Sequence, residues 1–210
     1  GMATTTKRAP ARDRLLDAAE ELFYEHGIAA TGVDAVLTRA GVAPATLYAH
    51  FAGKDHLVAA YLDRRLDRWR ATWDAALERC GDDPKARVLS LFDALEDFRS
   101  TPGNDRGCAF LAASVEVTDA DHPAHDVLAA DTRLLRERLR SLAAGSGAAD
   151  PEALAAELLL LYDGALAARA RSAVVPGGTR PVRDLAAAAV ARHTTMGVAA
   201  PSIETTAPLT

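Results

Sequence analysis

Apolar side chains recur every three to four residues along most of the chain, a spacing that places them on one face of a helix. In the first such stretch Leu15, Leu16, Ala19, Leu22 and Phe23 share a face. Segments rich in glycine and proline separate one stretch from the next. The pattern predicts about nine helices, over roughly residues 12–26, 33–40, 44–53, 54–80, 84–100, 107–119, 123–144, 151–173 and 181–196.

Composition agrees with an all-helical fold. Of the 210 residues, 49% are apolar and only 5% are aromatic, and much of the apolar content is alanine and leucine. Both are strong helix formers, and runs of β-branched residues are scarce. We therefore expect an all-α protein with enough apolar content for a sizeable core.

Several classes of protein find no support in the sequence. It holds no apolar run of 18 or more residues and no signal peptide, so we expect a soluble, cytoplasmic protein without a membrane partner. Cys80 and Cys108 are too few for a disulfide scaffold. The motifs of common hydrolases and phosphate-binding enzymes are missing, which indicates a protein that is not an enzyme and needs no cofactor. His122 and His125 stand among acidic residues, where a solvated turn that caps the next helix is favoured over a metal site.

Residues 33–51 carry the most informative pattern. Two short helices are joined by a turn in which Gly41 can adopt the left-handed backbone that a tight turn needs. Val36, Leu37 and Leu47 would form the small core that fixes the angle between the helices. The outward residues of the second helix are small or polar, so this helix could lie against base edges in the major groove of DNA. The pattern predicts a helix-turn-helix.

Further features surround this motif. A Phe and a Gly close the preceding helix, Thr-Gly opens the next one, Ala-Gly-Val forms the turn, and Leu-Tyr-x-His-Phe is followed closely by Lys54. With these features residues 12–58 resemble the N-terminal DNA-binding domain of the TetR family of transcriptional regulators. The combination is far more specific than a bare helix-turn-helix match.

The resemblance implies a set of DNA contacts. Thr31 and the backbone N–H groups that open the second helix would meet phosphate, the first residues of the third helix would face base edges, and Tyr48, His50 and Lys54 would reach further phosphates. Because the third helix lacks Arg, Asn and Gln, we expect modest direct readout, supplemented by DNA shape or by the basic arm. The implied contact residues are Thr31, Gly32, Val33, Pro44, Ala45, Thr46, Tyr48, His50 and Lys54.

The charge balance is unusual for a DNA-binding protein. The whole chain has a formal net charge of −5, and residues 1–58 hold six Lys and Arg against seven Asp and Glu. Binding must therefore depend on where the charges lie rather than on their sum. Lys7, Arg8, Arg12 and Arg14 cluster near the start, and we expect this cluster to serve DNA binding.

Beyond about residue 60 the resemblance implies an architecture rather than a motif. It implies a helical domain that binds a small-molecule effector and dimerises through its last two helices, near 151–173 and 181–196; a monomer with internal helices is the alternative. The larger side chains of the middle helices are candidates to line the effector pocket, although each could be ordinary core. They are Tyr61, Trp69, Trp73, Phe92, Phe98, Phe110 and Tyr162.

These observations predict a homodimeric transcriptional regulator, a repressor that a small-molecule effector releases from a palindromic DNA operator. The alternative is a regulator without such an inducer, which answers to a partner protein or to oxidation of Cys108. That thiol is expected near a helix N-terminus, which can lower its pKa, although a buried structural cysteine is favoured. The predicted divisions are a flexible basic arm (1–11), a helix-turn-helix domain (12–56), a ligand-binding and dimerisation domain (57–197) and a flexible tail (198–210).

Overall fold

The computed structural model describes residues 8–101, 108–176 and 181–195, and every regular element within them is an α-helix. The predicted all-α fold is confirmed. Lys7 and most of the expected arm, the expected breaks near 102–104 and 177–178, and the expected tail lie outside the described residues. The helices are α1 (Ala11–His26), α2 (Val33–Ala40), α3 (Pro44–His50), α4 (Lys54–Cys80), α5 (Pro84–Ser100), α6 (Ala109–Glu116), α7 (Ala124–Gly145), α8 (Pro151–Val174) and α9 (Val182–Thr195).

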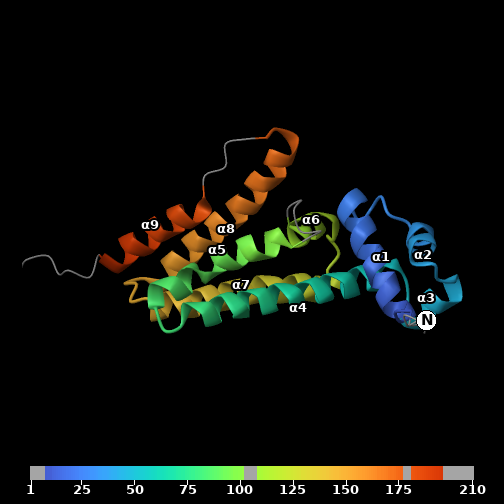
Figure 1. Cartoon of the computed structure of the whole chain (residues 1–210), viewed down its shortest axis with the longest axis horizontal. Helices are drawn as coiled ribbons and strands as arrows, with labels where there is room; N and C mark the ends of the chain where they lie inside the picture. Colours follow the sequence, from blue (N-terminus) through green and yellow to red (C-terminus); the bar gives the residue numbers. More distant parts are fainter. Residues whose placement is uncertain (1–7, 102–107, 177–180, 196–210) are drawn as a thin grey trace, which may run out of the picture.

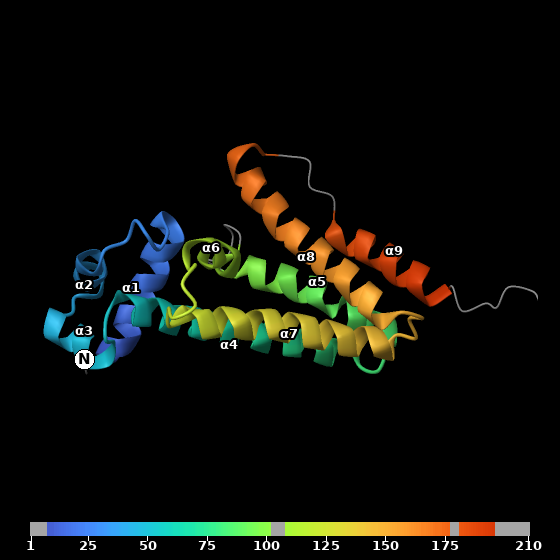
Figure 2. The same cartoon turned by 180° about the vertical axis from the view of Figure 1, so that it is seen from behind.

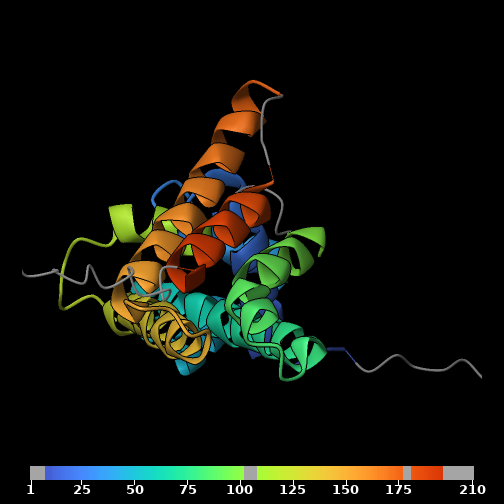
Figure 3. The same ribbon diagram turned by 90° about the vertical axis from the view of Figure 1, so that its left-hand side faces the viewer.

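The helices form an elongated molecule with a small three-helix group at one end (Figure 1). This group consists of α1, α2 and α3, and α4 runs from it along the length of a larger body that also contains α5, α7, α8 and α9. The reverse view shows α6 between α1 and the near end of α5 (Figure 2). Seen end-on, α8 and α9 stand together at one side of the body, and the C-terminal end of α8 extends beyond it (Figure 3).

The apolar face of α1 is the centre of the three-helix group. Leu15, Leu16 and Ala19 of α1 are at most 2% exposed and share one core with Val36 of α2 and Leu47 of α3. Because these residues recur at helical spacing, each of the three short helices turns its apolar side inward.

The turn between α2 and α3 has the expected left-handed glycine. Gly41 has φ 63° and ψ 44°, and the N–H of Val42 donates to the carbonyl oxygen of Leu37 at 3.1 Å. Arg14 Nη1 donates to the carbonyl oxygens of Ala40 and Gly41 at 3.2 and 3.3 Å. The guanidinium of α1 thus satisfies carbonyls that the end of α2 leaves without helical partners.

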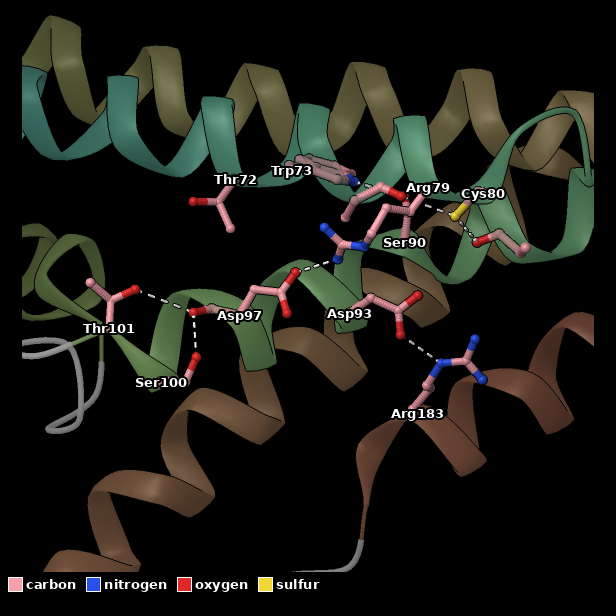
Figure 4. Close-up of polar contacts among 12 residues, drawn as sticks. Thr72, Trp73, Arg79, Cys80, Ser90, Asp93, Asp97, Ser100, Thr101 and Arg183 are labelled. Carbon is pink, nitrogen blue, oxygen red and sulfur yellow. Dashed lines mark hydrogen bonds and ion pairs between the residues drawn. The ribbon is translucent and has the colours of Figure 1, made fainter.

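Polar contacts join α5 to α4 on one side and to α9 on the other (Figure 4). The buried Nε1 of Trp73 in α4 donates to the hydroxyl oxygen of Ser90 in α5 at 2.9 Å. Further along α5, Asp93 accepts a hydrogen bond from Arg183 Nε of α9 at 2.8 Å. The second contact joins α9 to α5, on which α9 also packs, although α9 lies far from α5 in the sequence.

α6 is shorter than predicted. It covers Ala109–Glu116 instead of about 107–119, because the segment after it folds into a turn. Asp119 Oδ1 accepts the N–H of Asp121 at 2.9 Å, and His122 Nδ1 accepts the N–H of Ala124 at the start of α7 at 3.0 Å. The histidine segment therefore forms a turn that caps α7, as the sequence favoured.

We predict that Gly41→Ala lowers the free energy of unfolding by about 1–2 kcal/mol, because a Cβ is strained at positive φ. For a chain of this size the change corresponds to a drop in Tm of about 2–8 °C, measured by circular dichroism or calorimetry. Gly145→Ala is the matched control, since Gly145 has no positive φ and an added Cβ meets nothing within 4 Å. Equal melting temperatures for the two variants would contradict the role of the turn.

Candidate nucleic-acid interface and effector cavity

α3 presents almost all of its side chains to solvent. Leu47 is fully buried and anchors the helix, whereas Tyr48 is 56% exposed and Thr46 is half-buried. The helix ends at His50 rather than near residue 53, because Phe51 adopts extended backbone and inserts into the core. Small outward side chains let such a helix approach base edges closely. The exposed residues of α3 are Pro44, Ala45, Tyr48, Ala49 and His50.

The starts of α2 and α4 offer further groups to phosphate. Gly32 has extended backbone and directly precedes α2. Because it has no side chain, it cannot accept a hydrogen bond from the first N–H groups of α2. Asp34 adds a negative charge to the first turn of this helix. Lys54 is the first residue of α4, where the helix dipole disfavours a cation, so a nearby phosphate would improve its environment. Val33 is half-buried beside Gly32.

Thr31 is not placed for the phosphate contact that the resemblance implied. Its side chain is 3% exposed, and its hydroxyl lies 2.8 Å from the carbonyl oxygen of Gly27 and 3.2 Å from that of Leu22. The hydroxyl is therefore engaged by the end of α1 and is not free for phosphate. Thr31 positions the start of α2.

The basic residues of the three-helix group divide into two kinds. Arg14 binds the end of α2, whereas Arg39 Nη1 forms an exposed ion pair with Glu21 at 2.6 Å. Arg8 and Arg12 are exposed, and Arg12 lies 5.3 Å above the ring of Phe51. The expected basic cluster is thus smaller than the sequence suggested, because Arg14 has a structural role.

A small cavity, here called the body cavity, lies among α4, α5, α6, α7 and α8 and has a volume of about 40 Å³. Of the predicted pocket residues, Trp69, Phe98, Phe110 and Tyr162 line it. Its lining residues are Arg65, Trp69, Leu95, Phe98, Arg99, Cys108, Phe110, Asp131, Tyr162, Leu166 and Arg169.

Two predicted pocket residues belong to the core instead. Trp73 is fully buried and uses its N–H on Ser90, and Phe92 is 1% exposed; neither lines the body cavity. Aromatic side chains at helical spacing can be core as readily as cavity wall, and these two are packed in the core.

The remaining predicted residue, Tyr61, lines a second space, here called the interface cavity, of about 90 Å³ between α1, α4 and α6. Cys108 lines both cavities. Beside the interface cavity, Glu116 Oε2 accepts the N–H of Ala29 at 2.9 Å, which ties α6 to the loop between α1 and α2. A displacement of α6 would therefore act directly on the helix-turn-helix.

Sequence reasoning missed the buried arginine of the body cavity. Arg65 is 3% exposed, and its Nη1 has no hydrogen-bond partner. The signal was present, since Arg65 follows Tyr61 and precedes Trp69 by four residues each and so lies on the buried stripe of α4. Glu116 gave no such signal, because its partner is a backbone group 87 residues away.

The acidic wall of the body cavity is Asp131 of α7. Burial raises the pKa of this carboxyl to about 6, and the neighbouring charge of Asp163 acts in the same direction. Burial also raises the pKa of Asp163. Both carboxyls are therefore easier to protonate than ordinary aspartates.

Cys108 does not have the lowered pKa that a helix N-terminus could produce. It directly precedes α6, and backbone hydrogen bonds from Leu111 and Phe110 act to lower the pKa, but burial of the thiol outweighs them and the net pKa is raised. The thiol therefore stays protonated near neutral pH and is a poor nucleophile.

The described residues contain neither a metal-binding cluster nor a membrane-spanning helix. They contain no group of three or more His, Cys, Asp and Glu side chains arranged to hold a metal ion. None of the helices in residues 8–101, 108–176 and 181–195 combines the length and apolarity needed to cross a membrane.

Two domain families match the chain in order. Residues 15–61 match the bacterial regulatory proteins of the tetR family, and residues 84–173 match the tetracyclin repressor-like C-terminal domain. Among solved structures, SCO4454, a TetR-family transcriptional regulator from Streptomyces coelicolor, superposes with a TM-score of 0.74 at 34% identity, covering 88% of this chain and 94% of that one. A TetR transcriptional regulator (sav143) from Streptomyces avermitilis gives 0.67 at 33%, covering 87% and 99%.

Curated proteins give the same picture over shorter lengths. The chain is 33% identical over 100 residues to the HTH-type transcriptional repressor ComR of Escherichia coli, or 48% of each chain. It is 33% identical over 145 residues to the HTH-type transcriptional activator FasR of Mycolicibacterium smegmatis, which covers 64% of this chain and 66% of FasR. The chain thus spans between about half and two thirds of the length of these curated relatives.

These matches define the class of the protein as a helix-turn-helix regulator of transcription. The chain belongs to the TetR family, because both family domains and a relative at 34% identity over almost its whole length agree. It is a DNA-binding regulator and not an enzyme, as the sequence predicted.

We predict that the Cys108 thiol reacts several-fold more slowly with iodoacetamide at neutral pH than the same cysteine in the unfolded chain, because its raised pKa keeps the thiolate scarce. Peptide mass spectrometry after timed labelling measures the rate. Cys80, whose pKa burial also raises, serves as the internal comparison. Labelling of Cys108 in the folded protein faster than in the unfolded chain would restore the oxidation-sensor interpretation.

Proposed function

We propose that the chain binds a palindromic DNA operator as a homodimer and represses transcription there until a small-molecule effector releases it. The observation that carries the DNA-binding part is the exposed face of α3 beside Lys54. The first residues of α3 face base edges, and the other groups meet phosphates, which fix the register. The proposed contacts are Gly32, Val33, Pro44, Ala45, Thr46, Tyr48, His50 and Lys54. Since genomic DNA is the target, the protein acts in the cytoplasm.

The proposed dimer is supported by an apolar stripe on α8 that no other part of the described chain buries. Along α8, Ala156, Leu160, Gly164 and Ala167 follow one another at spacings of three and four residues, and all are exposed. Leu160 is 72% exposed, and Leu185 of α9 is 50% exposed. α8 and α9 pack against each other, and each carries a large exposed apolar side chain, which favours a partner surface; a second copy would complete a four-helix interface.

A dimer also fits the geometry of DNA. A two-fold pair of α3 helices reaches successive major grooves when the helices lie about 34–36 Å apart. The operator is then an inverted repeat, because an isologous dimer presents the same surface twice.

Release by an effector is supported by the contacts of α6. This helix touches the body cavity through Phe110 and holds the α1–α2 loop through Glu116. A ligand that favours a displaced α6 therefore favours a different placement of the DNA-binding helices. The curated relatives include one protein named a repressor and one named an activator, so repression is our proposal on the basis of this release mechanism.

A second candidate is a regulator that needs no small-molecule inducer. The small volumes of the body and interface cavities, about 40 and 90 Å³, favour it, because sites for drug-sized ligands usually have several hundred Å³. Of its two forms, sensing of a partner protein fits better than oxidation of Cys108, whose raised pKa disfavours the thiolate.

We predict that Lys54→Gln weakens binding to a duplex from the region upstream of the gene and flattens its salt dependence. The logarithmic slope of affinity against salt should fall by about 0.9 for each phosphate that the protein no longer neutralises. Fluorescence anisotropy over a salt series measures both effects. Lys85→Gln is the control, because Lys85 is exposed in the first turn of α5, at the other end of the molecule (Figure 1). An unchanged slope for Lys54→Gln would remove Lys54 from the interface.

We predict that Leu160→Glu converts the dimer to monomers at micromolar concentration, since a charge would replace the largest side chain of the exposed α8 stripe. Sedimentation velocity measures the species present. The control is Val115→Glu, which alters a side chain that is 78% exposed on α6, outside the proposed interface. If Leu160→Glu sediments as a dimer like the wild type, the α8 stripe does not form the dimer contact.

A further inference from the structure

Two residues of the body cavity wall, Arg65 and Trp69, each carry a buried donor that has no acceptor among the described residues. Nη1 of Arg65 and Nε1 of Trp69 are both fully enclosed and lack hydrogen-bond partners. The two residues are 3% and 4% exposed, lie one turn apart on α4, and both line the cavity. Because unpaired buried donors are costly, they point to a ligand that carries an acceptor.

The charge of Arg65 is only weakly compensated. Its nearest carboxylate is Glu20, at 3.8 Å from Nη1, which is too long for a hydrogen bond. The same carboxylate already accepts from Arg64 Nη2 at 2.6 Å and from Arg68 Nη1 at 2.7 Å. The carboxylate of Glu20 thus faces three guanidiniums, and its contact with Arg65 is the longest of the three.

The described lining of the cavity holds more arginines than carboxylates. Arg65, Arg99 and Arg169 line it, against Asp131 as the single carboxylate among the described lining residues. Arg99 pairs with Glu96 at 2.9 Å, and Glu96 does not line the cavity. Because Arg99 is already paired with Glu96, an anionic group in the cavity would gain chiefly from Arg65, whose ion pair with Glu20 is 3.8 Å long.

Aromatic rings form a large part of the remaining wall. The Trp69 ring lies 5.6 Å from Phe98 in an edge-to-face arrangement and 5.9 Å from Tyr162. The guanidinium of Arg65 lies 5.3 Å above the ring of Phe98. These rings suit a flat apolar group, and the two donors suit oxygen atoms at its edge.

We propose that the body cavity binds an aromatic carboxylate, with the carboxylate oxygens on Arg65 and the Trp69 N–H and the ring among Trp69, Phe98 and Tyr162. This inference rests on the proposed effector-responsive function and names its ligand class. A cavity of about 40 Å³ has room for a few water molecules, so a ring enters only if the wall gives way.

The part of the wall that can transmit this change is α6. Phe110 contributes to the cavity from this short helix, and the same helix ends at Glu116, which holds the N–H of Ala29. Displacement of Phe110 by the ring would loosen this contact. Ligand entry and release from DNA are then one event.

Intrinsic fluorescence tests the proposal directly, because the chain has only two tryptophans, Trp69 on the cavity wall and Trp73 one turn further along α4. The probes are benzoate, salicylate, 1-naphthoate and indole-3-acetate, each paired with its neutral amide. We expect at least one carboxylate to change the fluorescence saturably, with its amide about 10- to 100-fold weaker. Arg65→Met should weaken the carboxylate by a similar factor and leave the amide unchanged.

Arg68→Met is the matched control. Arg68 binds the same Glu20 from the same helix but is exposed and does not line the cavity, so this variant should bind the carboxylate like the wild type. Melting curves of both variants check folding, and retention of DNA binding by Arg65→Met, without release by the carboxylate, gives a second readout.

Three results would overturn the proposal: equal affinity for carboxylate and amide, wild-type affinity in Arg65→Met, or no saturation by any of the carboxylates up to about 10 mM. If the protein still binds its DNA in these cases, the proposed ligand class is wrong, but the proposed function as a DNA-binding regulator is not contradicted. If the protein selects no DNA at all, the proposed function itself fails.

Discussion

The burial of one face of α4 against two different groups of helices is the constraint on which the rest of the structure depends. Near its start, Leu57, Val58 and Tyr61 are buried in the core that includes α1, and Arg64 pairs with Asp17 of α1 at 2.8 Å. Further along, the same stripe supplies the core of the body. A single continuous helix therefore sets where the DNA-binding group stands relative to the body.

This arrangement explains how a small interior site could control a distant surface. The body cavity opens on α4 through Arg65 and Trp69, and on α6 through Phe110. Both helices also contact α1 or the loop after it, through the pair of Glu20 with Arg64 and the hydrogen bond of Glu116 with the N–H of Ala29. Packed helices shift between discrete arrangements rather than deform, and we propose that a ligand which displaces either helix moves the DNA-binding group.

Local features of the fold could be predicted from the sequence, and features that depend on distant partners could not. Helical spacing identified the buried face of α1, and glycine chemistry identified the turn at Gly41, because each signal lies within a few residues. The burial of Thr31 and the binding of Arg14 to the end of α2 depend on neighbours brought together by folding. For the same reason aromatic residues alone could not separate Trp69, on the cavity wall, from Trp73, in the core.

The proposed function requires that two copies of the three-helix group read DNA through α3. Selection of bound sequences from a random duplex pool, followed by sequencing, tests it most directly. We expect an enriched inverted repeat whose half-sites are about 10 base pairs, or a multiple of that, apart from centre to centre. Enrichment of a single asymmetric site, or no enrichment at low salt, would contradict it.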